Sequence, residues 1–259
     1  MAPAPTKLHG YLNLLKPPNV TSHDIVAAVR RLSGQRHVGH TGTLDPGAVG
    51  VLPVALGRAA PTVSSPIWSR KVYWADVTFG SRTTTDDAEG TEIEGGSYTG
   101  LALDRVTREL AHFVGESFQT PPAVSAVHVN GERAYARARR GETADQLAAR
   151  RVWIDAIELV GWAPPRMSIL VSCRSGTYVR ALARDIGIAV DCPAHLGALI
   201  RLRVGPFSVW NAFDLHELDA IASHDQWSAA LVPTDAVCGY AWALILADER
   251  AREIGRAHV

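Results

Sequence analysis

Alternating apolar and polar positions over residues 70–80 give the clearest prediction along the chain. Tyr73 and Phe79 begin and end a row of apolar side chains on one side, with Ala75 and Val77 between them. Because successive side chains of a strand point to opposite faces, this period of two predicts a strand with one face in a core. Further strands are predicted at residues 8–15, 124–129, 152–160, 167–173 and 203–210.

Helices are indicated by capping residues and by helical spacing. Thr21 is followed three residues later by Asp24, an arrangement that resembles a capping box, and Gly34 suits the end of that helix. Arg180 and Arg184 stand one turn apart and are therefore expected on one helix face. The other segments predicted to be helical or amphipathic are 102–114, 132–140, 177–188, 194–201, 215–222 and 227–231.

Two polar stretches that contain glycine are predicted to leave the regular scaffold. Residues 81–96, which include a run of threonines and aspartates, are expected to form a surface loop, and such a loop could reach a substrate. Asn130-Gly131 is a strong reversal signal, and it fits either a hairpin or a turn from a strand into a helix.

One carboxylate is isolated in the glycine-rich stretch 39–52. Four glycines there permit backbone angles that are closed to other residues, while Pro46 fixes its own φ and restricts the residue before it. Asp45 is therefore expected on a rigid loop that could present a nucleophile. The alternative is that Asp45 only forms a turn by capping nearby amides. His40, on the same loop, is expected to be exposed and functional.

Composition is typical of a globular protein with a large core. The chain has 259 residues, of which 47% are hydrophobic, and its 26 basic residues balance 26 acidic ones. A polyanionic partner must therefore meet a local basic patch. Arg133, Arg137 and Arg140 form such a stripe at helical spacing, and we expect it to follow an RNA backbone. A second basic cluster, at residues 30–37, fits a solvated helix face equally well.

Several classes of protein are disfavoured. The three cysteines, Cys173, Cys192 and Cys238, have no close spacing, which argues against a disulfide framework or a zinc site and favours a reducing compartment. No segment resembles a signal peptide, and no apolar run approaches the roughly 18 residues of a membrane span. We expect a cytoplasmic protein that needs no metal.

Arg180 is unfavourably placed for the helix that it begins. The dipole of a helix favours negative charge in the first turn, so an arginine there indicates an anionic partner from outside the helix. The alternative is a surface arginine paired with a neighbouring carboxylate.

Seven separated motifs, in order along nearly the whole chain, resemble those of the TruB family of tRNA pseudouridine-55 synthases. They are Leu15-Lys16-Pro17-Pro18 with Thr21-Ser22, the loop from Gly39 to Leu52, Lys71-Val72-Tyr73, the loop from Thr83 to Gly90, the segment from Pro121 to Ala126, the segment from Cys173 to Arg180, and Ala194-His195-Leu196.

The resemblance implies an α/β (α+β) pseudouridine synthase fold, in which helices and loops flank a mixed, largely antiparallel sheet. It implies isomerisation of one uridine in the T-loop of tRNA after the base is flipped out, without cofactor or metal. Residues 1–236 would form the catalytic domain, and residues 237–259 would begin a short or truncated RNA-binding region of PUA type. We expect a monomer that binds the T-stem-loop.

Three residues receive roles in the reaction from this resemblance. Asp45 takes the place of the essential aspartate, which would attack either the sugar or the base. Arg180 would pair with Asp45, and Tyr73 would stack on the target base. His40 would fill the space that the flipped base vacates, and Tyr178 and Leu199 would form an apolar wall of the pocket. The full set of residues expected to contact RNA is His40, Tyr178, Leu199, Lys16, Lys71, Arg133, Arg137 and Arg140.

Two other functions are weighed against isomerisation. An RNA-binding or folding-assistance protein could open the T-loop without chemistry, but it would not need the set of Asp45, Tyr73 and Arg180. A hydrolase with an aspartate nucleophile would need a metal or a second carboxylate, and no motif for either is present in the sequence.

Overall fold

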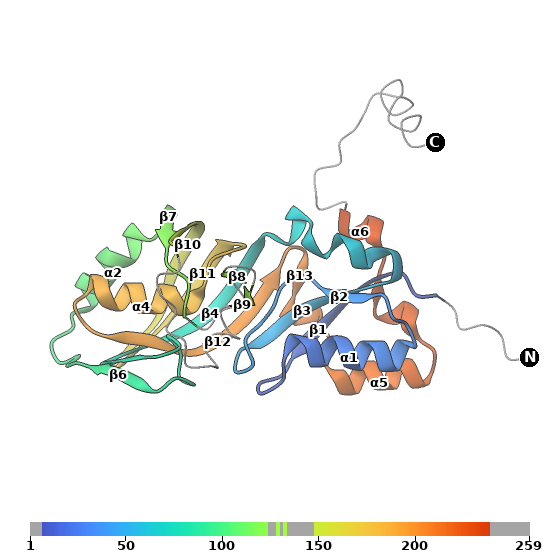
Figure 1. The fold of residues 1–259 in the computed structure, drawn as a ribbon, viewed down its shortest axis with the longest axis horizontal. Helices are drawn as coiled ribbons and strands as arrows, with labels where there is room; N and C mark the ends of the chain where they lie inside the picture. Colours follow the sequence, from blue (N-terminus) through green and yellow to red (C-terminus); the bar gives the residue numbers. More distant parts are fainter. Residues whose placement is uncertain (1–6, 124–127, 130–131, 134–147, 239–259) are drawn as a thin grey trace, which may run out of the picture.

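The computed structural model describes residues 7–123, 128–129, 132–133 and 148–238. A sheet of ten strands crosses the molecule in the order β14-β1-β3-β12-β4-β11-β10-β7, with β2 paired to β3 and β13 paired to β12 (Figure 1). Its strands are β1 (Gly10–Lys16), β2 (Val38–His40), β3 (Val49–Leu56), β4 (Arg70–Phe79), β7 (Gly115–Gln119), β10 (Arg150–Ala163), β11 (Arg166–Arg174), β12 (Ala194–Val204), β13 (Phe207–Ser208) and β14 (Leu231–Val232).

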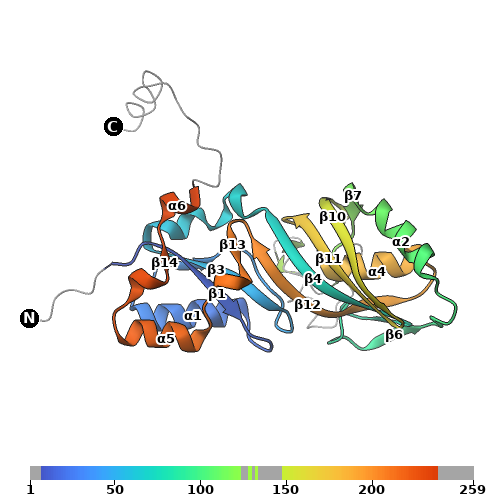
Figure 2. The same ribbon diagram turned by 180° about the vertical axis from the view of Figure 1, so that it is seen from behind.

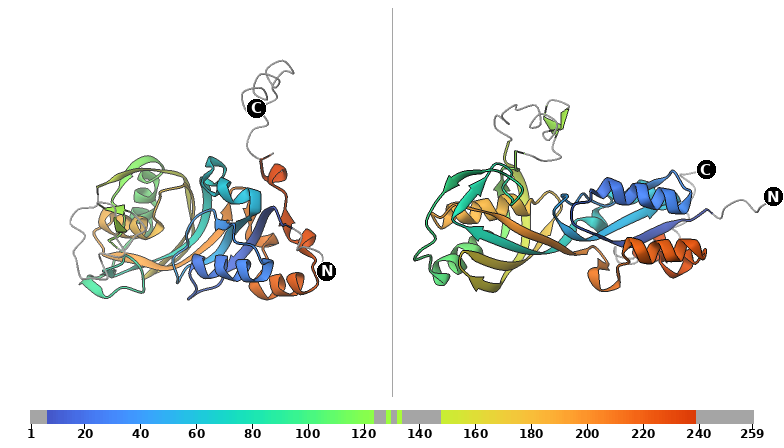
Figure 3. Two further views of the ribbon diagram at one scale, coloured as in Figure 1. Left: turned by 45° about the vertical axis from the view of Figure 1, so that its right-hand side comes forward. Right: turned by 90° about the horizontal axis from the view of Figure 1, so that it is seen from below.

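Helices cover the two halves of the sheet separately. Near β4, β11 and β10 lie α2 (Leu103–His112) and α4 (Val179–Ala189), while α1 (Ser22–Ser33) and α5 (Leu215–Ser223) pack beside β1 and β3 (Figures 1 and 2). The strands of the half that contains β4, β11 and β10 curve around α4 (Figure 3). The remaining described elements are the 3-10 helices η1 (Gly57–Ser64), η2 (Pro66–Trp68), η3 (Val209–Asn211) and η4 (Trp227–Ala229), the helix α6 (Thr234–Cys238), and the short strands β5 (Ser81–Thr83), β6 (Glu92–Gly95), β8 (His128–Val129) and β9 (Glu132–Arg133).

The two halves meet where β3 lies parallel to β12. All other pairs of strands in the sheet are antiparallel, and this parallel pair is short, with Ile200 opposite Val49 and Arg201 opposite Gly50. Gly50 has a φ of 114°, and a Cβ built there would lie 2.2 Å from the carbonyl oxygen of Arg201. The junction therefore requires glycine at this position.

Local sequence signals predicted several elements well. The helix α1 has Thr21 as its N-cap in a capping box with Asp24, and it ends at Gly34 in the left-handed conformation. The strand β4 buries Tyr73 and Phe79 on its apolar face. The strands β8 and β9, on either side of the reversal signal, pair antiparallel, which favours the hairpin alternative, although Asn130 and Gly131 themselves lie outside the described residues.

The prediction of a helix over residues 194–201 is wrong. These residues belong to β12, which pairs with β4 from Ala194 to Val204 and also with β3. Alanine and leucine favour helices, but hydrogen bonding to strands on both sides outweighs this weak local preference. The predicted strand at 203–210 is also interrupted, because Gly205 turns the chain between β12 and β13.

Residues 81–96 are more ordered than a surface loop. The strands β5 and β6 form a two-stranded sheet at the ends of this segment, and Thr83, at the end of β5, and Asp86, between the strands, are buried. The helix predicted for residues 132–140 falls mostly outside the described residues, although Glu132 and Arg133 at its start lie in β9.

Candidate active site

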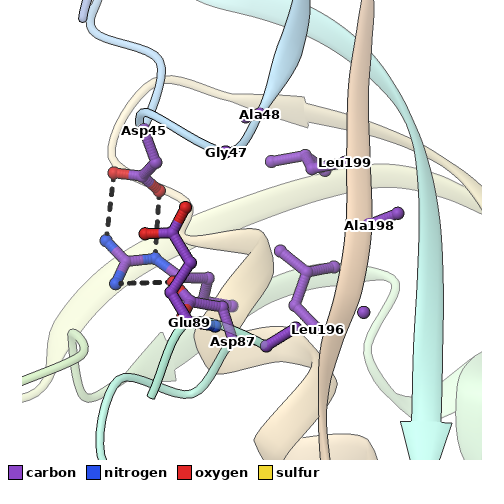
Figure 4. A pocket seen from close by; sticks show the side chains of 11 residues that line it. Asp45, Gly47, Ala48, Asp87, Glu89, Leu196, Ala198 and Leu199 are labelled. Atoms are coloured by element: carbon purple, nitrogen blue, oxygen red, sulfur yellow. Dashed lines mark hydrogen bonds and ion pairs between the residues drawn. The ribbon is translucent and has the colours of Figure 1, made fainter. Parts of the chain in front are cut away.

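Asp45 and Arg180 form a two-point ion pair. The Asp45 Oδ2 lies 3.0 Å from the Arg180 Nε, and the Asp45 Oδ1 accepts from the Arg180 Nη2 at 3.2 Å (Figure 4). The Arg180 side chain is only 7% exposed, whereas that of Asp45 is 42% exposed. A buried guanidinium at the start of α4 thus aims the carboxylate toward an opening.

A second carboxylate shares this arginine. The Asp87 Oδ2 lies 3.4 Å from the Arg180 Nη1, and the same nitrogen donates to the carbonyl of Thr85 at 3.1 Å. Arg180 therefore has anionic partners from two loops, which accounts for its position against the helix dipole. In the sequence, Asp87 stands out only as part of a polar run and of the motif from Thr83 to Gly90, and neither predicted a role for it.

The neighbours of Asp45 in the sequence are anchored through their backbone. The Ser22 hydroxyl accepts from the amide of Leu44 at 2.9 Å and donates to the Leu44 carbonyl at 3.2 Å. On the other side, the carbonyl of Pro46 accepts from the Lys16 Nζ and from the Asn19 amide, both at 2.9 Å. The backbone on each side of Asp45 is held by groups outside the loop.

Lys16, which is expected to contact RNA, is buried inside the protein rather than facing solvent. Lys16 is 1% exposed, and its ammonium also donates to the carbonyls of Pro17 and Val20, at 2.9 and 2.6 Å. Burial lowers the pKa of Lys16 to about 8. Lys16 holds the loop of Asp45 from inside the protein and leaves no proton facing solvent.

A second buried cation, Arg201, holds the beginning of the same loop. It is fully buried, and its guanidinium donates to the carbonyls of Gly42, Thr43 and Val51 at 3.0, 3.3 and 2.7 Å. The charge of Arg201 also acts on Tyr73, where it opposes the rise in the pKa of the hydroxyl that burial causes. The sequence analysis missed this residue, because it assigned position 201 to the end of a helix.

The carboxylate and the predicted base-stacking ring line one cavity. Asp45, Arg180 and Tyr73 surround a volume of about 250 Å³, together with Tyr178 and Leu199. Tyr73 is nearly buried, and burial raises the pKa of its hydroxyl, which is therefore protonated at neutral pH. Of the residues predicted for the site, the structure brings together at this cavity Asp45, Lys71, Tyr73, Tyr178, Arg180 and Leu199.

Lys71 lies at the same cavity and differs from Lys16 in its setting. It is half-buried, and its Nζ donates to the hydroxyl of Ser175 at 3.3 Å. Burial, together with the nearby charge of Arg201, lowers the pKa of Lys71 to about 8. Lys71 can therefore offer a positive charge to a ligand in the cavity at neutral pH.

His40 is half-buried at the end of β2 rather than freely exposed. Its Nδ1 accepts from the amide of Gly42 at 3.2 Å. Burial lowers the pKa of His40, and Arg201 adds to this effect, so the ring is neutral at pH 7.

Some predicted features lie outside the described residues. These are the side chains of Arg133, Arg137 and Arg140, and residues 239–259 of the proposed C-terminal region. Within the part of the chain that the structure describes, no group of three potential metal ligands is found. No helix among those residues is long and apolar enough to cross a membrane.

Comparisons with known proteins identify a family. Residues 30–179 match the model of the TruB family pseudouridylate synthase N-terminal domain, and residues 180–237 match that of the tRNA pseudouridylate synthase B C-terminal domain. A protein named tRNA pseudouridine synthase B from Gloeobacter violaceus is 44% identical over 82% of this chain and 74% of its own length. The protein of the same name from Symbiobacterium thermophilum is 44% identical over 91% of this chain and 78% of its own length.

Solved structures show the same fold. A chain in a crystal structure of a Cbf5-Nop10-Gar1 complex has a TM-score of 0.70 and 28% identity over 90% of this chain. A chain in a structure of an H/ACA RNP bound to a substrate RNA containing 2'-deoxyuridine has a TM-score of 0.67 and 25% identity. The match spans 62% and 61% of those longer chains. The expected fold class is therefore confirmed.

Proposed function

The chain belongs to the TruB family of pseudouridylate synthases, and on that premise we propose that it isomerises uridine 55 in the T-loop of tRNA to pseudouridine. It is thus an isomerase without a required metal or cofactor. It binds the T-stem-loop as a monomer.

The observation that carries this proposal is the cavity that Asp45 shares with Arg180 and Tyr73. A uridine inside a stacked loop cannot reach a carboxylate on a protein surface, so the base must first leave the stack at a cost of a few kcal/mol. Stacking on Tyr73 offsets part of this cost, since base–aromatic stacking contributes about 1–3 kcal/mol. His40, at the end of β2, fills the space that the base vacates.

Chemistry then follows at the exposed oxygen atoms of Asp45. The carboxylate attacks the nucleoside, or stabilises the sugar cation, as the bond from C1′ to N1 breaks. The uracil turns within the cavity, a bond forms between C1′ and C5, and the proton on C5 leaves while N1 gains one. The two-point contact with Arg180 keeps the carboxylate aligned through both steps.

Mapping of pseudouridine in an unmodified tRNA transcript tests the proposal. The transcript is incubated with the protein, treated with a carbodiimide that marks pseudouridine, and read by primer extension. We expect one stop, one nucleotide to the 3′ side of uridine 55, and none in a control transcript that has cytidine at position 55. A tRNA that binds but carries no new pseudouridine at position 55 would instead support a protein that only opens or folds the T-loop.

A further inference from the structure

A second arginine–aspartate pair lies behind the contact of Arg180 with Asp87, and the reaction described above does not use it. Arg184 follows Arg180 by one turn of α4, and its Nη1 donates to the Asp86 Oδ2 at 2.7 Å. The side chains of Arg184 and Asp86 are 9% and 7% exposed. Two consecutive aspartates of one loop thus meet two arginines that stand one turn apart on one face of the helix.

The backbone of the loop is bent so that both aspartates can face α4. Neighbouring side chains in an extended chain point in opposite directions. Asp86 has a φ of 59°, in the left-handed region, which is uncommon for residues other than glycine and costs about 1–2 kcal/mol. The carbonyl of Asp86 also accepts from the amide of Leu196 in β12 at 3.0 Å. This bend turns Asp86 and Asp87 toward the same helix.

Arg184 joins this loop to a third segment near the cavity. Its Nη2 donates to the carbonyl of Thr120 at 2.8 Å, just after β7. The preceding residue, Gln119, accepts from the amide of Tyr178 at 2.8 Å, and Tyr178 lines the cavity. The guanidinium also contacts Asp185, its neighbour in the helix, at 2.8–2.9 Å. Arg184 therefore connects the loop of Asp87, the first turn of α4 and the end of β7.

Removal of Arg184 would leave Asp86 without its closest cation. Burial raises the pKa of Asp86, and the charge of Arg184 opposes that rise. Its remaining cation would be Arg82, whose Nε lies 3.9 Å from the Asp86 Oδ1. A buried carboxylate that loses its closest partner is costly, so the loop would shift to bring Asp86 toward Arg82, to water or to a proton. Because Asp87 is the next residue, any such shift moves the second partner of Arg180.

We propose that Arg184 and Asp86 form a positioning pair that sets Asp87 and Arg180, and through them the orientation of the Asp45 carboxylate. Neither residue touches the cavity that holds the nucleoside. The kinetic part of this inference rests on the proposed function, because it is read as a rate of isomerisation.

The first test replaces both partners by neutral polar residues, in the variant Asp86→Asn/Arg184→Gln. We expect its single-turnover rate at saturating tRNA to fall about tenfold, which corresponds to about 1.4 kcal/mol, and its Kd for tRNA to stay within about twofold. The matched control is Arg105→Gln/Asp191→Asn, which neutralises an exposed ion pair between α2 and the end of α4. The rate of that control should equal the wild-type rate, and a wild-type rate for both variants would overturn the proposal.

The same substitutions in an Asp87→Asn background separate positioning from general loss of structure. If the pair of Arg184 and Asp86 acts through Asp87, replacing the pair in the Asp87→Asn background should lower the rate by less than about twofold. An equal, roughly tenfold fall in both backgrounds would overturn the proposal. If the neutral pair fails to fold, Arg184→Lys replaces it in both backgrounds, since lysine keeps the charge but lacks the planar fork.

A crystal structure of the neutral or lysine variant provides a test without activity. We expect the guanidinium of Arg180 to move away from its two-point contact with Asp45, and an unchanged contact would contradict the proposal. Turnover by the wild-type protein tests the proposed function. The rates in the wild-type and Asp87→Asn backgrounds, and the contact of Arg180 with Asp45 in the variant structure, test the role of the pair of Arg184 and Asp86. The two failures are therefore distinguishable.

Discussion

The two loops that meet at Arg180 are held in opposite ways. Residues 41–48 are held through backbone groups, which bind Lys16, Ser22 and Arg201. Residues 83–90 are held to α4 largely through carboxylate side chains, which bind arginines of that helix.

This difference determines which carboxylate is free to react. Where the backbone of a loop is fixed, its side chain need not serve as an anchor, and Asp45 remains 42% exposed. The side chains of Asp86 and Asp87 are 7% and 16% exposed, because they are used to fix their loop. Substitutions in the supports of the first loop should therefore change stability, whereas those in the second should change the rate.

The largest effect is expected for Arg201→Met. This substitution leaves the carbonyls that Arg201 binds without a buried donor, at about 1–3 kcal/mol each, and relief from burying the charge offsets part of the loss. We expect the free energy of unfolding in urea to fall by about 3 kcal/mol. Arg203→Met, in the same strand but exposed, is the control and should change it by less than about 0.5 kcal/mol. Equal changes for the two variants would contradict the role given to Arg201.

A smaller effect, on the rate rather than on stability, is expected for Asp87→Asn. Asparagine keeps the shape but removes the charge opposite Arg180, so the guanidinium is held in line with Asp45 by one charged partner fewer. The single-turnover rate should therefore fall about tenfold. The free energy of unfolding should change by less than about 1 kcal/mol. A large loss of stability with an unchanged rate would remove the distinction between the two loops.

The smallest effect concerns Lys71 and pH. Since the pKa of Lys71 is lowered to about 8, its charge is present at pH 7 and is lost as the pH rises through that value. If Lys71 meets an RNA phosphate, tRNA affinity should weaken about threefold between pH 7 and pH 9 at constant salt. Lys71→Arg, which stays charged, should show no such loss. Parallel pH profiles for both proteins would exclude this contact.

The sequence was sufficient for features that depend on local patterns. The capping box at Thr21 predicted the start of α1, and the alternation of apolar and polar residues predicted β4. The glycine-rich stretch around Asp45 predicted a loop that carries an isolated carboxylate. Arg180 lies in the first turn of its helix, where the helix dipole disfavours positive charge, and this position correctly indicated an anionic partner.

Features that depend on burial and on distant pairing could not be predicted in this way. A lysine or arginine in a sequence usually lies at the surface, and nothing local shows that Lys16 and Arg201 are buried against carbonyls. Nor could the polar run at 83–87 reveal that Asp86 adopts a left-handed φ and faces α4. The assignment of 194–201 to a helix failed for the same reason, because its strand neighbours are far away in the sequence.

The most direct test of the central claim is the release of tritium from tRNA that carries uridine labelled at C5. Formation of pseudouridine removes that hydrogen, so the wild-type protein should release one equivalent from uridine 55. The variant Asp45→Asn should bind the same tRNA with nearly unchanged affinity and release none. Release at the wild-type rate by this variant, or an equal loss of binding and release, would contradict a chemical role for Asp45.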